Sequence, residues 1–493
     1  MPPDRSTPQL TRVSLWLTRH GVLLATLAAA ALLVFLSTYH LTESPPIWTD
    51  EGHLTQVAMN TAVYGLQTQL QVAPGVFESG AFSETSGYPV LFPVAAAFYT
   101  FGVHLLSARS VMVIFILLFA LCVWQLAKRE MPLLLATYAL WLIVSFAPLY
   151  GNGKNVLGEV PGLFYLTAFL LCLTVIEKGE QSWMHYIGAG LFVGLAVSTK
   201  PIFLVALLPV AVVALFSPKM LLPLKTLAAL GAFLAATGVW IWVQFGNQTI
   251  AHVIDFYANP FAVDTVATIS SNAFLFISAP QPFYALVLLV LWTLSIPMRI
   301  RKRIPISRAE YTAFGFAVLI YLAFLRITPY YRYYFVGEIF ALFYLPLALW
   351  HVWPRRIPKV LFHAGIALLI AFQIYQCFFS SWVAGYYRSH RTAEVSQTLG
   401  ALPISASIFI YNAPELPLFL PAGMPYYQYL FLTPIVIIGK NELPLIAQGV
   451  PDFVIVKGDS TSRLDLSSYR IVREFDQYSL WQKKSLQRPA TPH

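Results

Sequence analysis

Apolar runs recur along most of the chain, and they constrain its fold more than any other feature of the sequence. A helix needs about 20 mainly apolar residues to cross a hydrocarbon core roughly 30 Å thick. We count about eleven such runs, some of them short, and their bounds are Val13 to Tyr39, Ser110 to Ala127, Leu133 to Tyr150, Val160 to Ile176, Tyr186 to Thr199, Ile202 to Phe216, Leu222 to Val243, Phe283 to Pro297, Tyr311 to Ile327, Val336 to Trp350 and Val360 to Phe379. The sequence therefore predicts an α-helical, multi-pass membrane protein.

The composition supports this prediction and argues against nucleic acid as a partner. Only 11% of the residues are charged, against roughly 25% in a soluble domain. The net charge is +9, but the lysines and arginines stand mostly in short clusters between apolar runs, as in the cytoplasmic loops of membrane proteins. The three cysteines lie in or beside apolar runs, so their spacing predicts neither a disulfide framework nor a metal site.

The positions of the basic clusters also predict an orientation. With the N-terminus in the cytoplasm, the clusters around Lys128, Arg301 and Arg356 all fall on the cytoplasmic side. A further apolar stretch, Tyr88 to Leu106, would invert this arrangement if it were a full span. Two prolines near its start favour a re-entrant or interfacial helix instead.

Two domains follow from this topology. Residues 1–379 form the predicted transmembrane domain, with an extracytoplasmic catalytic loop over residues 41–109. Residues 380–493 form a predicted extracytoplasmic domain of ordinary single-domain size. Its strands are predicted at Ser407 to Tyr411, Ile435 to Ile438, Phe453 to Lys457 and Tyr478 to Gln482. We expect a small α/β domain.

The first outward segment contains an acid pair. The stretch PPIWTDEGHLTQVAMNTAVYG, from Pro45 to Gly65, places Asp50 and Glu51 just past a predicted membrane exit. Apolar residues then recur at helical spacing, which predicts a short amphipathic helix along the membrane surface. Asp50 is either a catalytic acid or merely the N-cap of this helix, because Asp is a favoured N-cap residue.

More charged residues fall on the same predicted side. Lys154 and Glu159 stand in the short loop GNGKNVLGEVPG, Lys200 ends a span in the motif STKP, and Arg109 begins another span. Each has an ordinary alternative: Glu159 interacting with a helix dipole, Lys200 extending its charge to the interface, and Arg109 acting as an anchor.

Aromatic residues surround one more arginine. In TPYYRYYFVGE, Arg332 stands between Tyr331 and Tyr333, and Glu338 follows inside a span. An acid within a span is costly and is normally paired or lines a polar cavity. Arg332 or Lys200 is its expected partner, whether the pair is structural or functional.

This collection of charges suits transfer from a phosphate-linked donor. A carboxylate takes the proton of an attacking hydroxyl, while Arg and Lys hold the phosphate leaving group. Trp48, Tyr330 and Tyr331 are candidates to stack on sugar rings, although Tyr and Trp also form ordinary interfacial belts.

The same motifs resemble those of the GT-C glycosyltransferases. The acid pair, SGYPVLFPVAAAFYTFG, the arginine that opens the next span, NVLGEVPG, GLAVSTKP and PYYRYY occur in this order there. The chain is most similar to the protein O-mannosyltransferases and the lipid A aminoarabinose transferases, over roughly Pro45 to Trp350. It departs from them at Tyr88 and Pro89, where relatives often carry paired prolines.

The resemblance implies an inverting transferase that uses a polyprenyl-phosphate-sugar donor and a glycan, lipid or protein acceptor. It implies Asp50 as general base, with Glu51 and Glu159 as further acids. It also implies that Lys200 and Arg332 bind the donor phosphate. From their positions in the sequence, Arg109 and Lys154 are further candidate ligands of this phosphate. The predicted substrate cavity takes in Trp48, His53, Tyr88, Tyr331, Tyr333 and Glu338.

Several alternatives stay open. His53 lies one turn after Asp50, and the two would suit a divalent metal ion, but two ligands do not define a site. A ligase or polymerase that moves a whole oligosaccharide, and a glycolipid flippase or transporter, are the competing functions. We expect an integral protein of the bacterial cytoplasmic membrane whose active site faces outward.

Overall fold

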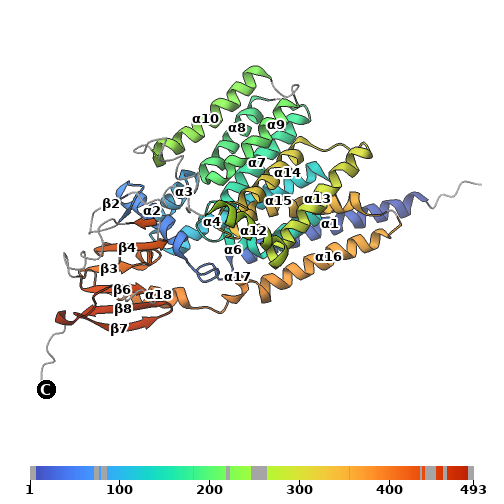
Figure 1. Cartoon of the computed structure of the whole chain (residues 1–493). Helices are drawn as coiled ribbons and strands as arrows, with labels where there is room; N and C mark the ends of the chain where they lie inside the picture. The colour runs from blue at the N-terminus through green and yellow to red at the C-terminus, as the bar shows by residue number, and fades with distance from the viewer. Residues whose placement is uncertain are drawn as a thin grey trace, which may run out of the picture.

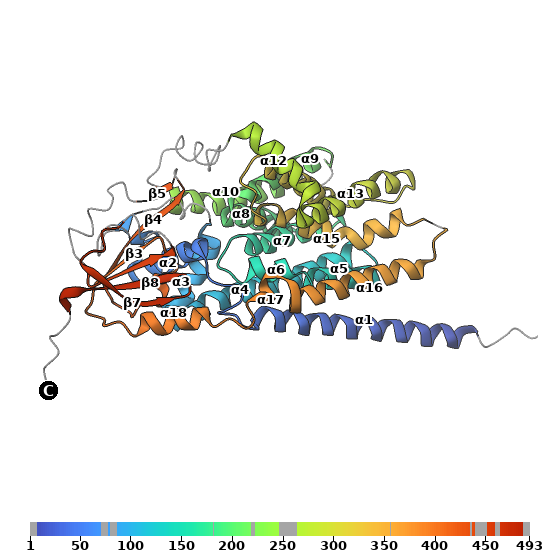
Figure 2. The ribbon, with the colours of Figure 1, turned by 60° about the horizontal axis from the view of Figure 1, so that its bottom comes forward.

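The computed structural model describes residues 7–70, 77–78, 86–180, 182–217, 222–245, 264–354, 356–433, 436–438, 451–458 and 464–486. A body of helices makes up most of the molecule, and a β-sheet lies at one end of it (Figures 1 and 2). Its main helices are α1 (Thr7–Thr38), α2 (Thr49–Tyr64), α3 (Tyr88–Phe101), α4 (Leu105–Glu130), α5 (Leu133–Val144), α6 (Ala147–Gly153), α7 (Glu159–Glu177), α8 (Trp183–Thr199), α9 (Leu207–Leu215), α10 (Pro223–Phe245), α12 (Thr265–Ser278), α13 (Pro280–Arg301), α14 (Arg308–Phe324), α15 (Arg332–Val352) and α16 (Lys359–Tyr375).

The described residues contain seven helices that are long and apolar enough to cross a membrane. An eighth span results if α5 and α6, which meet at a bend of 54°, are taken together. The predicted multi-pass architecture is confirmed, but the count of about eleven spans is not. All eleven predicted runs fall on helices, yet α8, α9 and α14 are each shorter than any of the seven helices counted above. The helix α3 is also short, with 14 residues.

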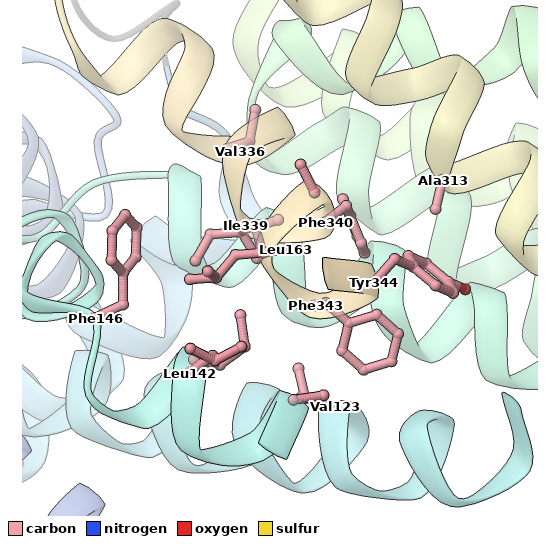
Figure 3. Close-up of a cluster of buried hydrophobic side chains, with 14 of the residues drawn as sticks. Val123, Leu142, Phe146, Leu163, Ala313, Val336, Ile339, Phe340, Phe343 and Tyr344 are labelled. Carbon is pink, nitrogen blue, oxygen red and sulfur yellow. The ribbon is translucent and has the colours of Figure 1, made fainter. Parts of the chain in front are cut away.

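Helix α15 forms the centre of the helical body. Every residue from Tyr334 to Ala348 is buried, as expected for a helix that is apolar on all sides. Figure 3 shows Ile339, Phe340 and Phe343 of α15 among side chains from α4, α5 and α7. This packing fixes the N-terminal end of α15, where Arg332 and Glu338 lie.

The C-terminal sheet has six strands in the order β5-β4-β3-β6-β8-β7. The strands are β3 (Ile408–Tyr411), β4 (Tyr426–Thr433), β5 (Val436–Ile438), β6 (Phe453–Lys457), β7 (Tyr469–Phe475) and β8 (Tyr478–Lys483). Strand β3 is parallel to both β4 and β6, and the remaining pairs are antiparallel. With the short helix α18 (Arg391–Gly400) packed near it, this is the small C-terminal α/β domain that the sequence predicted. Strands β4 and β7 were not predicted.

Candidate active site

Helix α2 carries the acid pair, and it is an enclosed helix. Its polar residues Thr55, Gln56 and Asn60 are buried along with its apolar ones. The predicted helix is therefore present, and other parts of the protein cover its polar residues. The N-cap residue is Trp48, so Asp50 lies within the first turn and is not the N-cap. At Gly65 the backbone adopts φ 70°, which glycine tolerates, and the helix ends there.

The C-terminal domain covers α2 on one side. A Cβ atom at Gly52 would lie 2.4 Å from the backbone nitrogen of Glu415, so the two backbones touch and only glycine fits. The buried Glu415 accepts hydrogen bonds from Lys457 Nζ and the Tyr478 hydroxyl, each at 2.6 Å. Gln56 of α2 donates a hydrogen bond to the Tyr426 hydroxyl and accepts one from Gln428, both in β4. Segments far apart in the sequence thus hold the acid pair in place.

Glu51 pairs with Arg109 in the interior. Arg109 Nε and Nη2 donate to the two carboxylate oxygens at 2.9 and 2.6 Å, and both side chains are fully buried. Arg109 also donates to the carbonyls of Leu41 and Pro45 and to Asn155 Oδ1. Because the hydrogen bonds of Arg109 and Glu51 go to buried protein groups, the structure does not favour Arg109 as a phosphate ligand or Glu51 as a reacting acid. The pair instead joins α2, α4 and the loop before α7.

Asp50 pairs with Arg332, the first residue of α15. Both side chains keep some exposure, at 18% and 13%. The guanidinium also lies over the rings of Trp48 and Tyr333, at 5.0 and 5.2 Å from their centroids. Its Nε is buried and has no hydrogen-bond partner among the described residues. The Asp50–Arg332 pair is thus partly exposed, and the guanidinium keeps one buried N–H donor that no described residue uses.

Lys200 pairs with Glu159, which begins α7. The negative charges of both Asp50 and Glu159 act on Arg332 and on Lys200. The structure thus brings together four of the predicted residues as two neighbouring ion pairs. Glu159 retains a buried oxygen, Oε2, that has no partner among the described residues.

A cavity of about 670 Å³ opens beside Arg332, a size suited to a small-molecule ligand. Arg332 lines it together with Trp48, Tyr331 and Glu338, three of the residues that we assigned to a substrate cavity from the sequence. Its other walls carry aromatic residues and amides, namely Phe146, Tyr284, Tyr330, Phe372, Trp382, Asn152, Asn155, Gln281, Gln373 and Gln376. Aromatic surface with scattered amide donors suits a sugar ring.

Other predicted residues lie elsewhere or have different partners. Glu338 accepts a hydrogen bond from the Tyr331 hydroxyl at 2.7 Å, so neither Arg332 nor Lys200 is its partner. Lys154 is buried and donates to the carbonyl of Tyr39 at 2.8 Å, which does not favour contact with a donor phosphate. The half-buried Tyr88 donates to the carbonyl of Ala236 in α10, because α3 packs against that helix.

His53 is fully buried behind Asp50. Its Nδ1 lies 2.5 Å from Gln69 Nε2. Among the described residues, no three His, Cys, Asp or Glu side chains come together as metal ligands. Burial lowers the pKa of His53 to about 4, because loss of solvation outweighs the opposing effect of the Asp50 charge; the charge of Lys457 lowers it further.

This lowered pKa predicts an acid-sensitive fold. The unfolded chain binds a proton on His53 near pH 6.5, and the folded chain does so only near pH 4. The contribution of His53 to stability is therefore full above pH 6.5 and falls by about 3 kcal/mol as the pH drops to 4. In melting curves from pH 7.5 to 4.5, His53→Gln should lose less stability with acid than the wild type does. Equal pH dependence in both proteins would contradict this prediction.

Three residues that contact helix α2 or its neighbours were not identified from the sequence. Gln69 contacts His53 of α2, and Lys457 contacts both Thr49 of α2 and Glu415. These are tertiary contacts between segments that lie apart in the sequence. Asn155, a partner of Arg109, could have been identified from the sequence, because it begins the motif NVLGEVPG that resembles the GT-C enzymes.

Comparison with known proteins supports the fold. Residues 89–242 match the family model described as dolichyl-phosphate-mannose-protein mannosyltransferase. No curated protein matches the chain. Among solved structures, ArnT from Cupriavidus metallidurans in the apo state has a TM-score of 0.65 at 15% identity, covering 96% of this chain and 100% of that one. The same protein bound to undecaprenyl phosphate has a TM-score of 0.64 at 14% identity, with coverages of 96% and 99%.

A more distant likeness extends to an archaeal enzyme. The oligosaccharyltransferase of Archaeoglobus fulgidus, tethered with an acceptor peptide, has a TM-score of 0.53 at 12% identity, covering 90% of this chain and 70% of that one. The family model and the structural likeness agree with the motif order in the sequence. The chain is a multi-pass membrane protein whose fold is the one that its motifs predicted, that of the GT-C glycosyltransferases.

Proposed function

We propose that this protein is an inverting glycosyltransferase that moves a sugar from a polyprenyl-phosphate donor to an acceptor hydroxyl. One observation carries the proposal: the ion pairs Asp50–Arg332 and Lys200–Glu159 are neighbours, and Arg332 also lines a cavity with aromatic and amide walls. The undecaprenyl phosphate bound to the similar ArnT supports the choice of donor class.

The proposed chemistry uses each pair differently. The donor phosphate binds Lys200 and Arg332 and so competes with Asp50 for the guanidinium. Asp50 then accepts the proton of the acceptor hydroxyl. The acceptor oxygen forms a bond to the anomeric carbon as the bond to the phosphate oxygen breaks on the opposite face. The two cations stabilise the departing phosphate.

The remaining acids and cations hold this machinery in place. Glu159 orients Lys200, and the pair of Glu51 with Arg109 fixes α2 against α4. We propose that Arg109 and Lys154 act through the fold, because their hydrogen bonds go to buried protein groups.

The charge distribution favours an enzyme over a transporter. A transporter is expected to gather ionisable groups near the middle of the bilayer, whereas here the two ion pairs join the starts of α2, α7 and α15 and the end of α8. We propose that this end faces outward from a bacterial cytoplasmic membrane. The donor's lipid tail would enter between helices, and the acceptor would come from the aqueous side.

Binding of undecaprenyl phosphate to the purified protein tests the donor site. Lys200→Met should weaken binding by about 10- to 100-fold, because a charged hydrogen bond is lost. This change leaves Glu159 buried and unpaired, so the double variant Lys200→Met/Glu159→Gln serves as a check on folding. If the folded double variant binds undecaprenyl phosphate as well as the wild type does, Lys200 is not a phosphate ligand.

A further inference from the structure

A second cavity lies between α9 and α14, apart from the candidate active site. It has a volume of about 690 Å³, and its walls include Leu208, Val212, Phe216, Val318 and Leu319. Several of these side chains are open to the surroundings, and Phe216 is 82% exposed. In a membrane protein such a surface faces lipid. Figure 1 shows α9 and α14 in the helical body, apart from the sheet.

The two helices touch beside this groove. A Cβ atom at Gly315 would lie 2.7 Å from Cβ of Pro209, so the contact of α14 with α9 is close there. Both residues line the groove. A long, flexible apolar chain fits such a space better than a compact ligand does.

One end of the groove is polar. Ser217 and Arg308 line it there. Arg308 Nε donates to Ser217 Oγ, and Nη1 donates to Glu177 Oε1 at 2.7 Å. Its Nη2 has no hydrogen-bond partner among the described residues, and the side chain is 35% exposed. An accessible guanidinium nitrogen at the end of an apolar groove is suited to a phosphate.

The adjoining loop adds positive charge. Arg301, Lys302 and Arg303 are all exposed, and the loop that they begin runs through Ile306, on the groove wall, to Arg308. Arg301 and Arg303 form no ion pair with any carboxylate that the structure describes. Uncompensated cations at a helix end favour anionic lipid headgroups.

We propose that this groove is a binding site for an anionic phospholipid. One acyl chain lies between α9 and α14, the phosphate accepts a hydrogen bond from Arg308 Nη2, and Arg301 and Arg303 attract the negative headgroup. This site is independent of the proposed transferase reaction, because none of its residues belongs to the candidate active site.

Native mass spectrometry of the purified full chain tests the site. The protein is incubated with equal amounts of phosphatidylglycerol and phosphatidylethanolamine that carry the same acyl chains. The wild type should retain phosphatidylglycerol in preference, and Arg301→Gln/Arg303→Gln should reduce that preference at least about fivefold. Val212→Trp, which fills the groove from a half-exposed position, should reduce retention of both lipids.

Matched controls separate this result from general effects. Arg470→Gln/Arg473→Gln removes two exposed arginines from β7 and should leave the preference unchanged. Melting temperatures verify that each variant is folded. An equal preference in the wild type and in Arg301→Gln/Arg303→Gln overturns the proposal. Added undecaprenyl phosphate that displaces phosphatidylglycerol from the wild type but fails to bind Val212→Trp also overturns it, because the groove then holds the donor's tail.

Discussion

Asp50→Asn is expected to reduce sugar transfer by about 10²- to 10⁴-fold, the usual contribution of a positioned general base. The amide keeps the size of the carboxylate but no longer accepts the proton of the attacking hydroxyl. The measurement compares envelope glycans by mass spectrometry in cells that express the wild type, no protein, or equal amounts of the variant. A sugar modification that is present only with the wild type would identify the transferred sugar by its mass.

The matched control for this prediction is Asp465→Asn. Asp465 is an exposed acid outside the candidate active site, and its carboxylate accepts a hydrogen bond from the backbone of Ser467. This variant should produce the modification at the wild-type level. If Asp50→Asn does the same while cells without the protein lack the modification, Asp50 is not the general base. If no glycan differs between the wild type and the null cells, the transferase proposal itself fails in those cells.

Arg109→Met is expected to destabilise the protein by about 3 to 5 kcal/mol, the usual result of removing one partner from a buried ion pair. The change leaves the carboxylate of Glu51 buried without its guanidinium, and it removes the donors to Leu41, Pro45 and Asn155. Thermal unfolding in detergent measures the loss. The double variant Arg109→Met/Glu51→Gln should recover part of it, because no unpaired charge is left.

An exposed pair provides the comparison for this second prediction. Arg473 contacts Glu394 at 3.6 Å, with both side chains more than 40% exposed, so Arg473→Met should cost no more than about 1 kcal/mol. A comparably small cost for Arg109→Met, together with weaker binding of undecaprenyl phosphate, would instead make Arg109 a ligand of the donor phosphate, one of the two roles that its position in the sequence allows.

The structure sorts the charged residues in a way that the sequence does not. Arg109 and Arg332 both stand at the start of a long apolar helix and both resemble phosphate ligands in sequence. Only Arg332 lines a cavity and keeps an unused donor, whereas Arg109 is saturated by groups from three separate segments. The difference arises from residues 46 to 68 positions away along the chain, which no local pattern reveals.

The enclosed position of α2 has a similar cause. Its alternation of apolar and polar residues is typical of a helix at a membrane surface. The C-terminal sheet covers that polar face with Tyr426 and Gln428, more than 360 residues away along the chain. Hydrogen bonds to these partners compensate the burial of Gln56.

The sequence by itself determined the membrane class, the positions of the helical runs and the order of motifs that predicted the GT-C fold. These features rest on local composition, because a long apolar run has few other ways to satisfy its backbone in a bilayer. It also predicted that Asp50, Glu159, Lys200 and Arg332 lie on the same side of the membrane, and the structure brings these four residues together. Only the tertiary structure decided which acid pairs with which cation, because charge pairing depends on distances between segments that the sequence separates.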